Sequence, residues 1–214
     1  MMKLKVLNLY ACLWGNRYLW DNCEVTAVEL DPELARMYQE RFPNDIVIIA
    51  DAHQYLLDHY REFDFIWTSP PCPTHSRVRF SQKNKDYYKA QYPSMVLYEE
   101  IIFLKHHFEW KYVVENVIPY YKPLIQWQTR WRHIYWCNFE LPTILSERKQ
   151  PKISNNKDEV SILVKFHNID LSWYKWWQRK DKISRNLVDY EAWKTIYDTM
   201  RWIKNSNIVQ NTLF

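Results

Sequence analysis

The chain has 214 residues and a formal net charge of +4, from 29 lysines and arginines against 25 acidic residues. This length is typical of one domain with a sizeable core, and so small a charge permits a nucleic-acid partner without indicating one. The four cysteines form no Cys-x-x-Cys pair, and no apolar run is long enough to span a bilayer. We therefore expect a cytoplasmic protein from a reducing compartment, with no metal site and no membrane segment.

Glycine and tryptophan occur in unusual numbers. The chain has a single glycine, Gly15, and 12 tryptophans, whereas average usage would give about fifteen glycines in a chain of this length. Turns that need a positive φ must be made by asparagine and aspartate, or the sequence has lost glycines that it once used.

The first 117 residues alternate between strand-like and helix-like segments. Apolar, β-rich runs predict strands at 4–10, 24–30, 46–50, 63–67 and 111–117. The second strand is followed by a helix that Asp31 caps, with Pro32 at its first position. Further helices are predicted through Tyr55 and Tyr60 and over about 94–109. Alternation this regular predicts a doubly wound, Rossmann-like α/β fold with a mostly parallel sheet and helices on both faces.

Four chemically active residues fall at or just past the carboxyl ends of successive strands, namely Glu29, Asp51, Cys72 and Glu115. In a doubly wound sheet these positions share one edge and can converge on one cleft. Any single acid at such a position is more often a helix cap or a solvated turn residue. Four in register favour a functional site.

Cys72 follows two consecutive prolines, which leave the backbone little freedom. A basic loop containing His75, Arg77 and Arg79 comes next. A thiol on a rigid elbow that faces cations suits a nucleophilic cysteine. A small apolar cysteine at the end of a strand explains this segment about equally well.

The second half of the chain is less regular. Residues 128–139 alternate like one strand, which predicts that Arg130 and Arg132 point to the same face, as a solvated edge or as a clamp for phosphate or carboxylate. The run 160–166 predicts another strand, and 188–204 a final amphipathic helix. Aromatic residues and cations interleave between them, which suits stacking on bases and pairing with phosphates, or else a satellite core beside solvated charges: Trp173, Trp176, Trp177, Arg179, Lys180 and Lys182.

Seven motifs in order carry a resemblance to a known family. They are the loop Asn8–Gly15, Glu29, Asp51 in Ala-Asp-Ala, Pro70-Pro71-Cys72 with Ser76, Glu115-Asn116-Val117, Gln128-x-Arg130-x-Arg132 and Arg185-Asn186-Leu187-Val188. The chain resembles the cytosine-5 DNA methyltransferases, which use S-adenosylmethionine, over most of residues 4–142 and about 183–204. Pro-Pro-Cys and Glu-Asn-Val are individually unspecific, but seven motifs in the right order rarely arise by chance.

The resemblance implies a set of site residues. Catalytic roles fall to Cys72, Glu115, Arg130 and Arg132. Contacts to the cofactor fall to Tyr10, Ala11, Cys12, Leu13, Gly15, Glu29, Leu30, Asp51, Ala52, Pro71, Asn186 and Val188. Together with the aromatic and cationic run, the loop after Cys72 gives candidate nucleic-acid contacts at Ser76, Arg77, Arg79, Arg179 and Lys180.

The implied chemistry is attack of the Cys72 thiolate on carbon 6 of a flipped-out cytosine, which makes carbon 5 able to accept a methyl group. Glu115, held protonated in a dry pocket, would donate a hydrogen bond to nitrogen 3. Arg132, with Arg130 beside it, would hold the base or its phosphate, and the loop around Arg77 and Arg79 is a candidate lid.

The chain departs from the family pattern in three places. Residues 143–182 offer only a minimal target-recognition region between the catalytic parts, 1–142 and 183–214, of one compact domain. Pro73 replaces the glutamine that usually follows the nucleophile. Cys12 and Trp14 stand where the cofactor loop usually has glycines, and Trp193 stands where a small residue is expected. One hypothesis is that some tryptophans, Trp14 among them, are glycines in the native product, misassigned through a reassigned codon.

These observations favour a small, monomeric DNA cytosine-5 methyltransferase of the bacteriophage or restriction-modification type. An RNA cytosine methyltransferase is the first alternative, because a minimal recognition region suits a structured substrate. A catalytically silent nucleic-acid-binding relative is the second, because the altered cofactor loop could weaken binding of S-adenosylmethionine.

Overall fold

The computed structural model describes residues 3–13, 15–81, 83–86, 88–148, 158–172 and 180–202, apart from the side chain of Lys182. Within these residues the strands are β1 (Leu4–Leu9), β2 (Cys23–Glu29), β3 (Ile46–Ile49), β4 (Phe65–Thr68), β5 (Lys111–Val117), β6 (Gln128–Arg130) and β7 (His133–Cys137). They form one sheet in the order β3-β2-β1-β4-β5-β7-β6. The first five strands are parallel, and β7 runs antiparallel to both of its neighbours. The predicted α/β fold with a mostly parallel sheet is confirmed.

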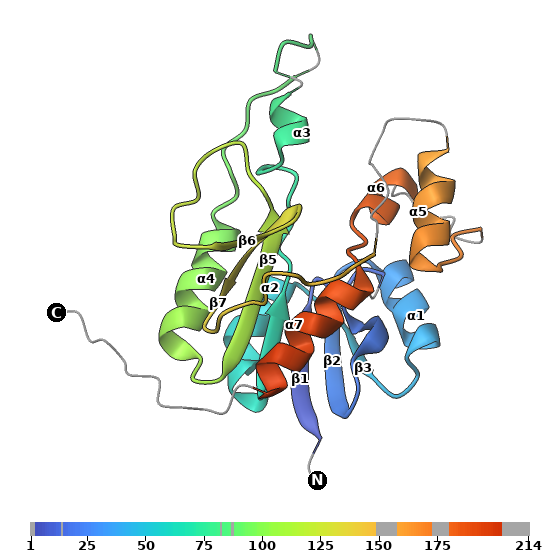
Figure 1. The fold of residues 1–214 in the computed structure, drawn as a ribbon, viewed down its shortest axis with the longest axis vertical. Coiled ribbons are helices and arrows are strands. Elements are labelled where there is room, and N and C mark those ends of the chain that lie inside the picture. The colour runs from blue at the N-terminus through green and yellow to red at the C-terminus, as the bar shows by residue number, and fades with distance from the viewer. Residues whose placement is uncertain are drawn as a thin grey trace, which may run out of the picture.

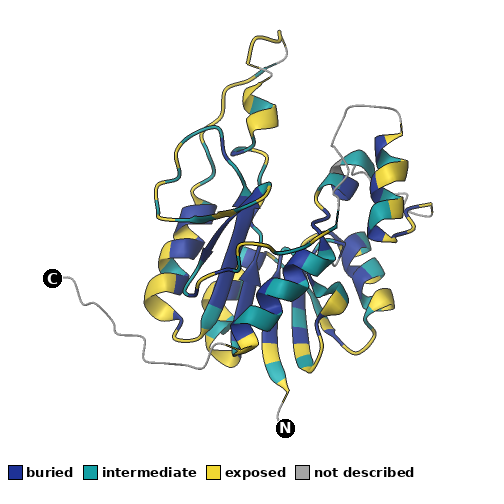
Figure 2. Cartoon of the chain, in the orientation of Figure 1, coloured by how far each residue is buried: buried dark blue, intermediate teal, exposed yellow. Residues whose placement is uncertain are grey.

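Helices cover both faces of the sheet (Figure 1). They are α1 (Pro32–Arg41), α2 (Ala52–His59), α3 (Arg77–Phe80), α4 (Val96–His107), α5 (Glu159–His167), α6 (Lys180–Arg185) and α7 (Tyr190–Trp202), with short 3-10 turns η1 (Arg17–Leu19) and η2 (Tyr60–Glu62). One core cluster joins α2 and α4 to one face of the sheet, and two others join α7 and α1 to the opposite face. Figure 2 shows the central strands β4 and β5 buried between these layers, whereas the edge strands β3 and β6 are partly exposed.

Local chemistry sets the ends of the first helices. The Asp31 carboxylate accepts hydrogen bonds from the backbone N–H groups of Glu33 and Leu34, and Pro32 occupies the first helical position. Asp51 caps α2 in the same way by accepting from the Gln54 N–H. Each cap satisfies N–H groups that have no partner inside the helix. The predicted start of α1 is confirmed.

Residues 128–139 do not form the single strand that their alternation predicts. The chain reverses at Trp131 and Arg132, so that β6 and β7 pair as an antiparallel hairpin with Arg130 opposite His133. Trp131 has φ of 53°, a conformation that normally calls for glycine at the first position of a two-residue hairpin turn. The expectation that Arg130 and Arg132 share one face of one strand is therefore wrong, because Arg132 belongs to the turn.

The predicted strand at 160–166 is also wrong, because these residues lie in α5. Valine, isoleucine and phenylalanine in this run favour a strand by propensity. The buried positions, however, are Glu159, Leu163 and His167, and a spacing of four residues places them on one face of a helix.

Several predictions fall outside the described residues. They concern Trp14, the aromatic run at 173–177 and Arg179. The division into catalytic parts and a recognition region at 143–182 stays a prediction.

Candidate active site

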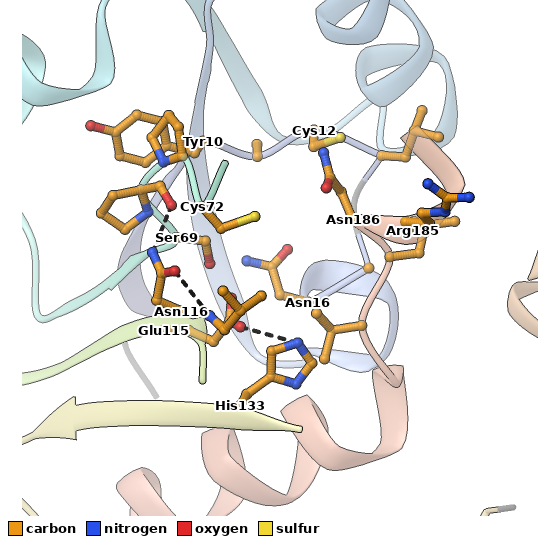
Figure 3. Close-up of a pocket in the computed structure, with 18 of the residues that line it drawn as sticks. Tyr10, Cys12, Asn16, Ser69, Cys72, Glu115, Asn116, His133, Arg185 and Asn186 are labelled. Carbon is orange, nitrogen blue, oxygen red and sulfur yellow. Dashed lines mark hydrogen bonds and ion pairs between the residues drawn. The ribbon is translucent and has the colours of Figure 1, made fainter. Parts of the chain in front are cut away.

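A cavity of about 300 Å³ lies at the carboxyl ends of the parallel strands (Figure 3). The first group of residues that line it comes from the amino-terminal half of the chain: Tyr10, Ala11, Cys12, Leu13, Gly15, Asn16, Glu29 and Leu34. The second group surrounds the Pro-Pro-Cys elbow and the end of β5: Ser69, Pro70, Pro71, Cys72, Pro73, Glu115, Asn116 and Val117. The third group comes from β7 and the end of the chain: His133, Arg185, Asn186, Leu187, Val188 and Trp193.

The loop after β1 closes one side of this cavity. Tyr10 and Cys12 have φ of 57° and 44°, which is unusual for residues other than glycine. The Glu29 carboxylate supports the loop by accepting from the Cys12 N–H at 2.8 Å, while its other oxygen accepts from the Asp31 N–H at 2.9 Å. Burial raises the pKa of Glu29, and these backbone donors oppose the shift.

A buried glutamate of α4 anchors the same loop. The Tyr10 hydroxyl donates to Glu100 at 2.6 Å, and the Thr68 hydroxyl donates to its other oxygen at 2.5 Å. His53 lies 3.2 Å from the first of these oxygens. Several hydrogen bonds to one buried carboxyl group fix its geometry, so the Tyr10 ring is held at the rim of the cavity.

The Pro-Pro-Cys elbow places Cys72 inside the cavity. The Asn116 side chain donates to the Pro70 carbonyl at 2.9 Å, which joins the elbow to β5. The N–H groups of His75 and Ser76 donate to the Cys72 carbonyl and turn the chain away from the thiol. Burial, and then the charge of Glu115, raise the pKa of Cys72 to about 11, so the resting thiol is protonated at neutral pH.

Glu115 is the carboxyl group beside this thiol. It is buried on β5, and burial raises its pKa to about 7, against a hydrogen bond from Ser69 that lowers it. Its Oε1 lies 3.5 Å from Nε2 of His133. A dashed line marks this contact in Figure 3. A buried carboxyl group that is half protonated at neutral pH can donate or accept a proton there.

The structure brings together most of the predicted cofactor residues and two of the predicted catalytic residues. Those that line the cavity are Tyr10, Ala11, Cys12, Leu13, Gly15, Glu29, Pro71, Cys72, Glu115, Asn186 and Val188. Leu30, Asp51 and Ala52 do not line it. Leu30 is exposed, Asp51 caps α2, and Ala52 packs in the core against the sheet.

The two predicted catalytic arginines also lie outside this cavity. Arg130 donates to the carbonyls of Leu141 and Pro142 and pairs with Glu140, and it lines a second cavity of about 360 Å³. The Arg132 guanidinium lies over the Trp131 ring, 4.5 Å from its centroid. The position beside Glu115 belongs to His133.

Three of the predicted nucleic-acid residues, Ser76, Arg77 and Arg79, lie in α3 or at its start. This helix extends beyond the carboxyl edge of the sheet in Figure 1. Ser76 caps α3 by accepting from the Val78 N–H. Arg77 donates to the Pro119 carbonyl, and Arg79 donates to the Lys89 carbonyl. Lys180 begins α6 and is therefore not part of α3.

The prediction from sequence missed several lining residues. Asn16, Leu34, Ser69, His133, Leu187 and Trp193 are among them. Asn16 forms a buried amide pair with Asn8 of β1, a pairing for which the sequence gives no signal. Arg185 and Asn116 are part of the motifs Arg185–Val188 and Glu115–Val117, so membership in these motifs is the sequence signal that indicates their place in the site.

In the described part of the chain, no group of three or more His, Cys, Asp or Glu side chains is arranged to hold a metal ion. Among the same residues, no helix is both long and apolar enough to cross a membrane.

Comparisons with solved structures return distant likenesses. Spodoptera frugiperda DNMT2 is 19% identical, with 72% of this chain and 56% of that chain covered and a TM-score of 0.44. The Escherichia coli protein yhhF is 14% identical, covering 63% and 74% of the two chains at a TM-score of 0.39. A SAM-dependent methyltransferase from Agrobacterium tumefaciens is 17% identical, covering 56% and 40% at a TM-score of 0.37.

A search of the curated proteins finds no match to the chain. A comparison with protein-family models gives a more specific result. The model of the family described as C-5 cytosine-specific DNA methylase matches residues 4–118, which is more than half of the 214 residues and includes the loop after β1, Cys72 and Glu115. The chain therefore belongs to the C-5 cytosine-specific DNA methylase family.

Proposed function

We propose that this protein transfers a methyl group from S-adenosylmethionine to carbon 5 of cytosine in DNA, through a covalent adduct with Cys72. One observation carries the proposal. The Cys72 thiol and the Glu115 carboxyl group line the same cavity as the loop after β1 and Glu29. A nucleophile, an acid and a candidate cofactor loop thus lie within reach of one bound base.

Cys72 and Glu115 divide the chemistry between them. The Cys72 sulfur, as thiolate, forms a bond to carbon 6 of the ring, and the electron pair of the 5,6 double bond moves toward nitrogen 3. The protonated Glu115 carboxyl group donates to nitrogen 3 and meets that charge. The electron pair is then available at carbon 5 for methylation. Loss of the carbon 5 proton to water and departure of the sulfur restore the aromatic ring.

The residues of the cavity fit S-adenosylmethionine, which when bound supplies an electrophilic methyl group on a sulfonium. Each carboxylate oxygen of Glu29 accepts one backbone N–H. Because a carboxylate offers about four acceptor positions, each oxygen can still accept from a ribose hydroxyl. A Cβ atom on Gly15 would lie 3.4 Å from the backbone of Val188, so this loop and the Asn186–Val188 segment are in close contact.

Nucleic acid is the proposed substrate, reached with the target base flipped out of the helix. Arg77 and Arg79 precede an arm that also carries Lys83, Lys85 and Lys89, a run of cations that suits phosphate contacts. We assign recognition of the neighbouring bases to residues 143–182, with Arg179 and Lys180 as candidate contacts.

Transfer of a labelled methyl group tests the proposal. Duplex DNA, single-stranded DNA and structured RNA of matched cytosine content are incubated with the protein and methyl-labelled S-adenosylmethionine. We expect label in DNA as 5-methylcytosine, and none with Cys72→Ala. Label in RNA alone would overturn the DNA assignment. Binding of DNA without any label, from a protein that binds S-adenosylmethionine, would overturn the catalytic assignment.

Calorimetric titration compares the affinity for S-adenosylmethionine of the protein that has Trp14 with that of the Trp14→Gly variant. Binding by both supports the proposal directly. Binding by Trp14→Gly alone indicates that tryptophan at this position blocks an otherwise competent site. Binding by neither favours a silent nucleic-acid-binding protein.

A further inference from the structure

Strand register places His133, not Arg132, next to the proposed acid. In the antiparallel pairing of β5 and β7, Glu115 lies opposite Tyr135 and Val117 lies opposite His133. Glu115 and His133 are therefore diagonal neighbours on one face of the sheet, a relation in which long side chains meet. The observed separation of 3.5 Å between His133 Nε2 and Glu115 Oε1 agrees with this relation.

Both partners are buried in the wall of the cavity. The side chains of His133 and Glu115 are 9% and 7% exposed, and both line the cavity that contains Cys72. Arg132 occupies the turn before β7, with its guanidinium over the Trp131 ring. Arg130 is held by carbonyls of the segment after β7. Neither arginine lines the cavity.

We propose that His133 is a positioning residue that holds the Glu115 carboxyl group against nitrogen 3 of the target cytosine. The inference rests on the proposed function for its substrate, but the contact between the two side chains stands independently. A neutral imidazole has one N–H and one free nitrogen, so it can hold one carboxyl oxygen while the other faces the base.

Histidine differs from arginine at this position in its charge. Burial and the charge of Arg132 lower the pKa of His133 to about 3, so its imidazole is neutral at pH 7. A neutral partner leaves the proton on Glu115, whereas a fixed cation would favour the carboxylate. The other ionisable or polar groups that act on the pair include Cys72, Ser69 and Tyr135 beside Glu115, and Arg132 beside His133.

The first test measures the titration of Glu115 directly and needs no activity. The side-chain carboxyl carbons of glutamate are labelled with ¹³C, and Glu115→Gln assigns the resonance. We expect His133→Arg to lower the titration midpoint of Glu115 by about one pH unit or more, and Arg132→Leu to move it by less. An unchanged midpoint in His133→Arg, or a larger shift in Arg132→Leu, overturns the inference.

The second test measures turnover. We expect His133→Ala to lower kcat about 100-fold, the cost of misplacing a catalytic group, with the Kd of S-adenosylmethionine within about threefold of the original. His133→Gln keeps an amide near the Nε2 position, and we expect it to recover at least about a tenth of kcat. His106→Ala, at an exposed histidine of α4, is the matched control. Equal kcat in His133→Ala and His106→Ala overturns the inference.

The two tests separate this inference from the proposed function. If His133→Arg shifts the titration midpoint of Glu115 but the protein never forms 5-methylcytosine, the proposed function is contradicted and the coupling of His133 to Glu115 stands. If the protein transfers methyl groups but the titration midpoint of Glu115 is unchanged in His133→Arg, the positioning role of His133 is contradicted and the proposed function stands.

Discussion

At the scale of single residues, Trp131 is held in a backbone conformation that suits glycine. Its φ is 53°, and a side chain in this region costs roughly 1–2 kcal/mol. Its neighbours across the hairpin turn, Arg130 and His133, pair directly, so the turn cannot relax without loss of that pairing. This residue gives structural support to the hypothesis that some tryptophans stand in place of glycines.

Comparison of two substitutions at one position isolates this strain. We expect Trp131→Gly to be more stable than Trp131→Ala by about 1 kcal/mol, since both lose the indole and differ only in the Cβ atom. Urea denaturation measures the difference. Trp110 is similarly exposed, at 48% against 54%, and is not among the residues with positive φ. At Trp110 we expect the opposite order, with Trp110→Ala more stable than Trp110→Gly by about 0.5–1 kcal/mol. The same order at both positions contradicts the account.

The two ionisable groups of the cavity predict a pH dependence for methyl transfer. The reactive form needs Cys72 as thiolate and Glu115 protonated, although burial sets their pKa values to about 11 and about 7. Below pH 7 one proton must be lost, so the rate rises about tenfold per pH unit. Between the two pKa values the share of the reactive form is constant, so the rate is level.

Replacement of Glu115 changes the shape of this profile. The amide in Glu115→Gln donates to nitrogen 3 at every pH, so only the thiol titrates. We expect a lower rate that keeps rising about tenfold per pH unit from pH 6 to pH 9, where the original enzyme levels off near pH 7. Single-turnover methyl transfer measures both profiles. A level profile above pH 7 in Glu115→Gln would contradict the assigned roles.

At the scale of elements, Asn116 fastens the nucleophile elbow to β5. Its amide donates to the Pro70 carbonyl, and its oxygen accepts from the Val117 N–H, in a side chain that is 2% exposed. We expect Asn116→Ala to cost about 1–3 kcal/mol, because it leaves buried groups unpaired. The substitution also removes the hydrogen bond that joins the Pro-Pro-Cys elbow to β5, so Cys72 is held less firmly and we expect kcat to fall.

Asn138 provides the matched control for this prediction. It also makes two bonds to backbone, with the Trp110 carbonyl and the Tyr112 N–H, but it lies at the surface end of the sheet and outside the cavity. We expect Asn138→Ala to cost less in urea denaturation and to leave kcat in place. An equal loss of kcat in the two variants would show that the elbow does not depend on Asn116.

A second link joins α5 to the segment that lines the cavity. Arg185 pairs with both oxygens of the buried Glu159, at 3.1 and 2.6 Å. We expect Glu159→Gln to cost about 1–3 kcal/mol and to weaken binding of S-adenosylmethionine, since Arg185 and Asn186 line the cavity. The exposed pair of Glu33 and Arg36 is the control, where Glu33→Gln should cost under about 1 kcal/mol. Unchanged cofactor affinity in Glu159→Gln contradicts this link.

The elements that could be predicted from sequence are those whose signals are local. β5 was predicted at 111–117, the bounds that it has, and the cap and proline of α1 defined its start. The hairpin of β6 and β7 could not be predicted, since its turn uses Trp131 where a glycine or asparagine would give the signal. His133 was missed for the same reason, because its position opposite Val117 depends on that hairpin. In α5, strand propensity concealed a helical burial pattern.

At the scale of the whole molecule, the parallel strands place the candidate catalytic and cofactor residues at one edge of the sheet, where their carboxyl ends lie. Glu29 ends β2, Cys72 follows β4, and Glu115 lies near the end of β5. Because these strands are parallel, residues far apart in sequence line one cavity. Strand order therefore predicts the convergence of Glu29, Cys72 and Glu115, but not the position of Asp51, which caps α2 outside the cavity. The positions of Arg130 and Arg132 could not be predicted in this way, because they depend on where the antiparallel strands β6 and β7 reverse.

Covalent trapping tests the central claim most directly. DNA that contains 5-fluorocytosine is incubated with the protein and S-adenosylmethionine, then resolved under denaturing conditions. Methyl transfer to this base leaves fluorine where the proton should depart, so the sulfur cannot leave. We predict a complex that survives denaturation, requires S-adenosylmethionine and is absent in Cys72→Ser. No complex from a protein that binds S-adenosylmethionine, or an equal complex in Cys72→Ser, would contradict the account.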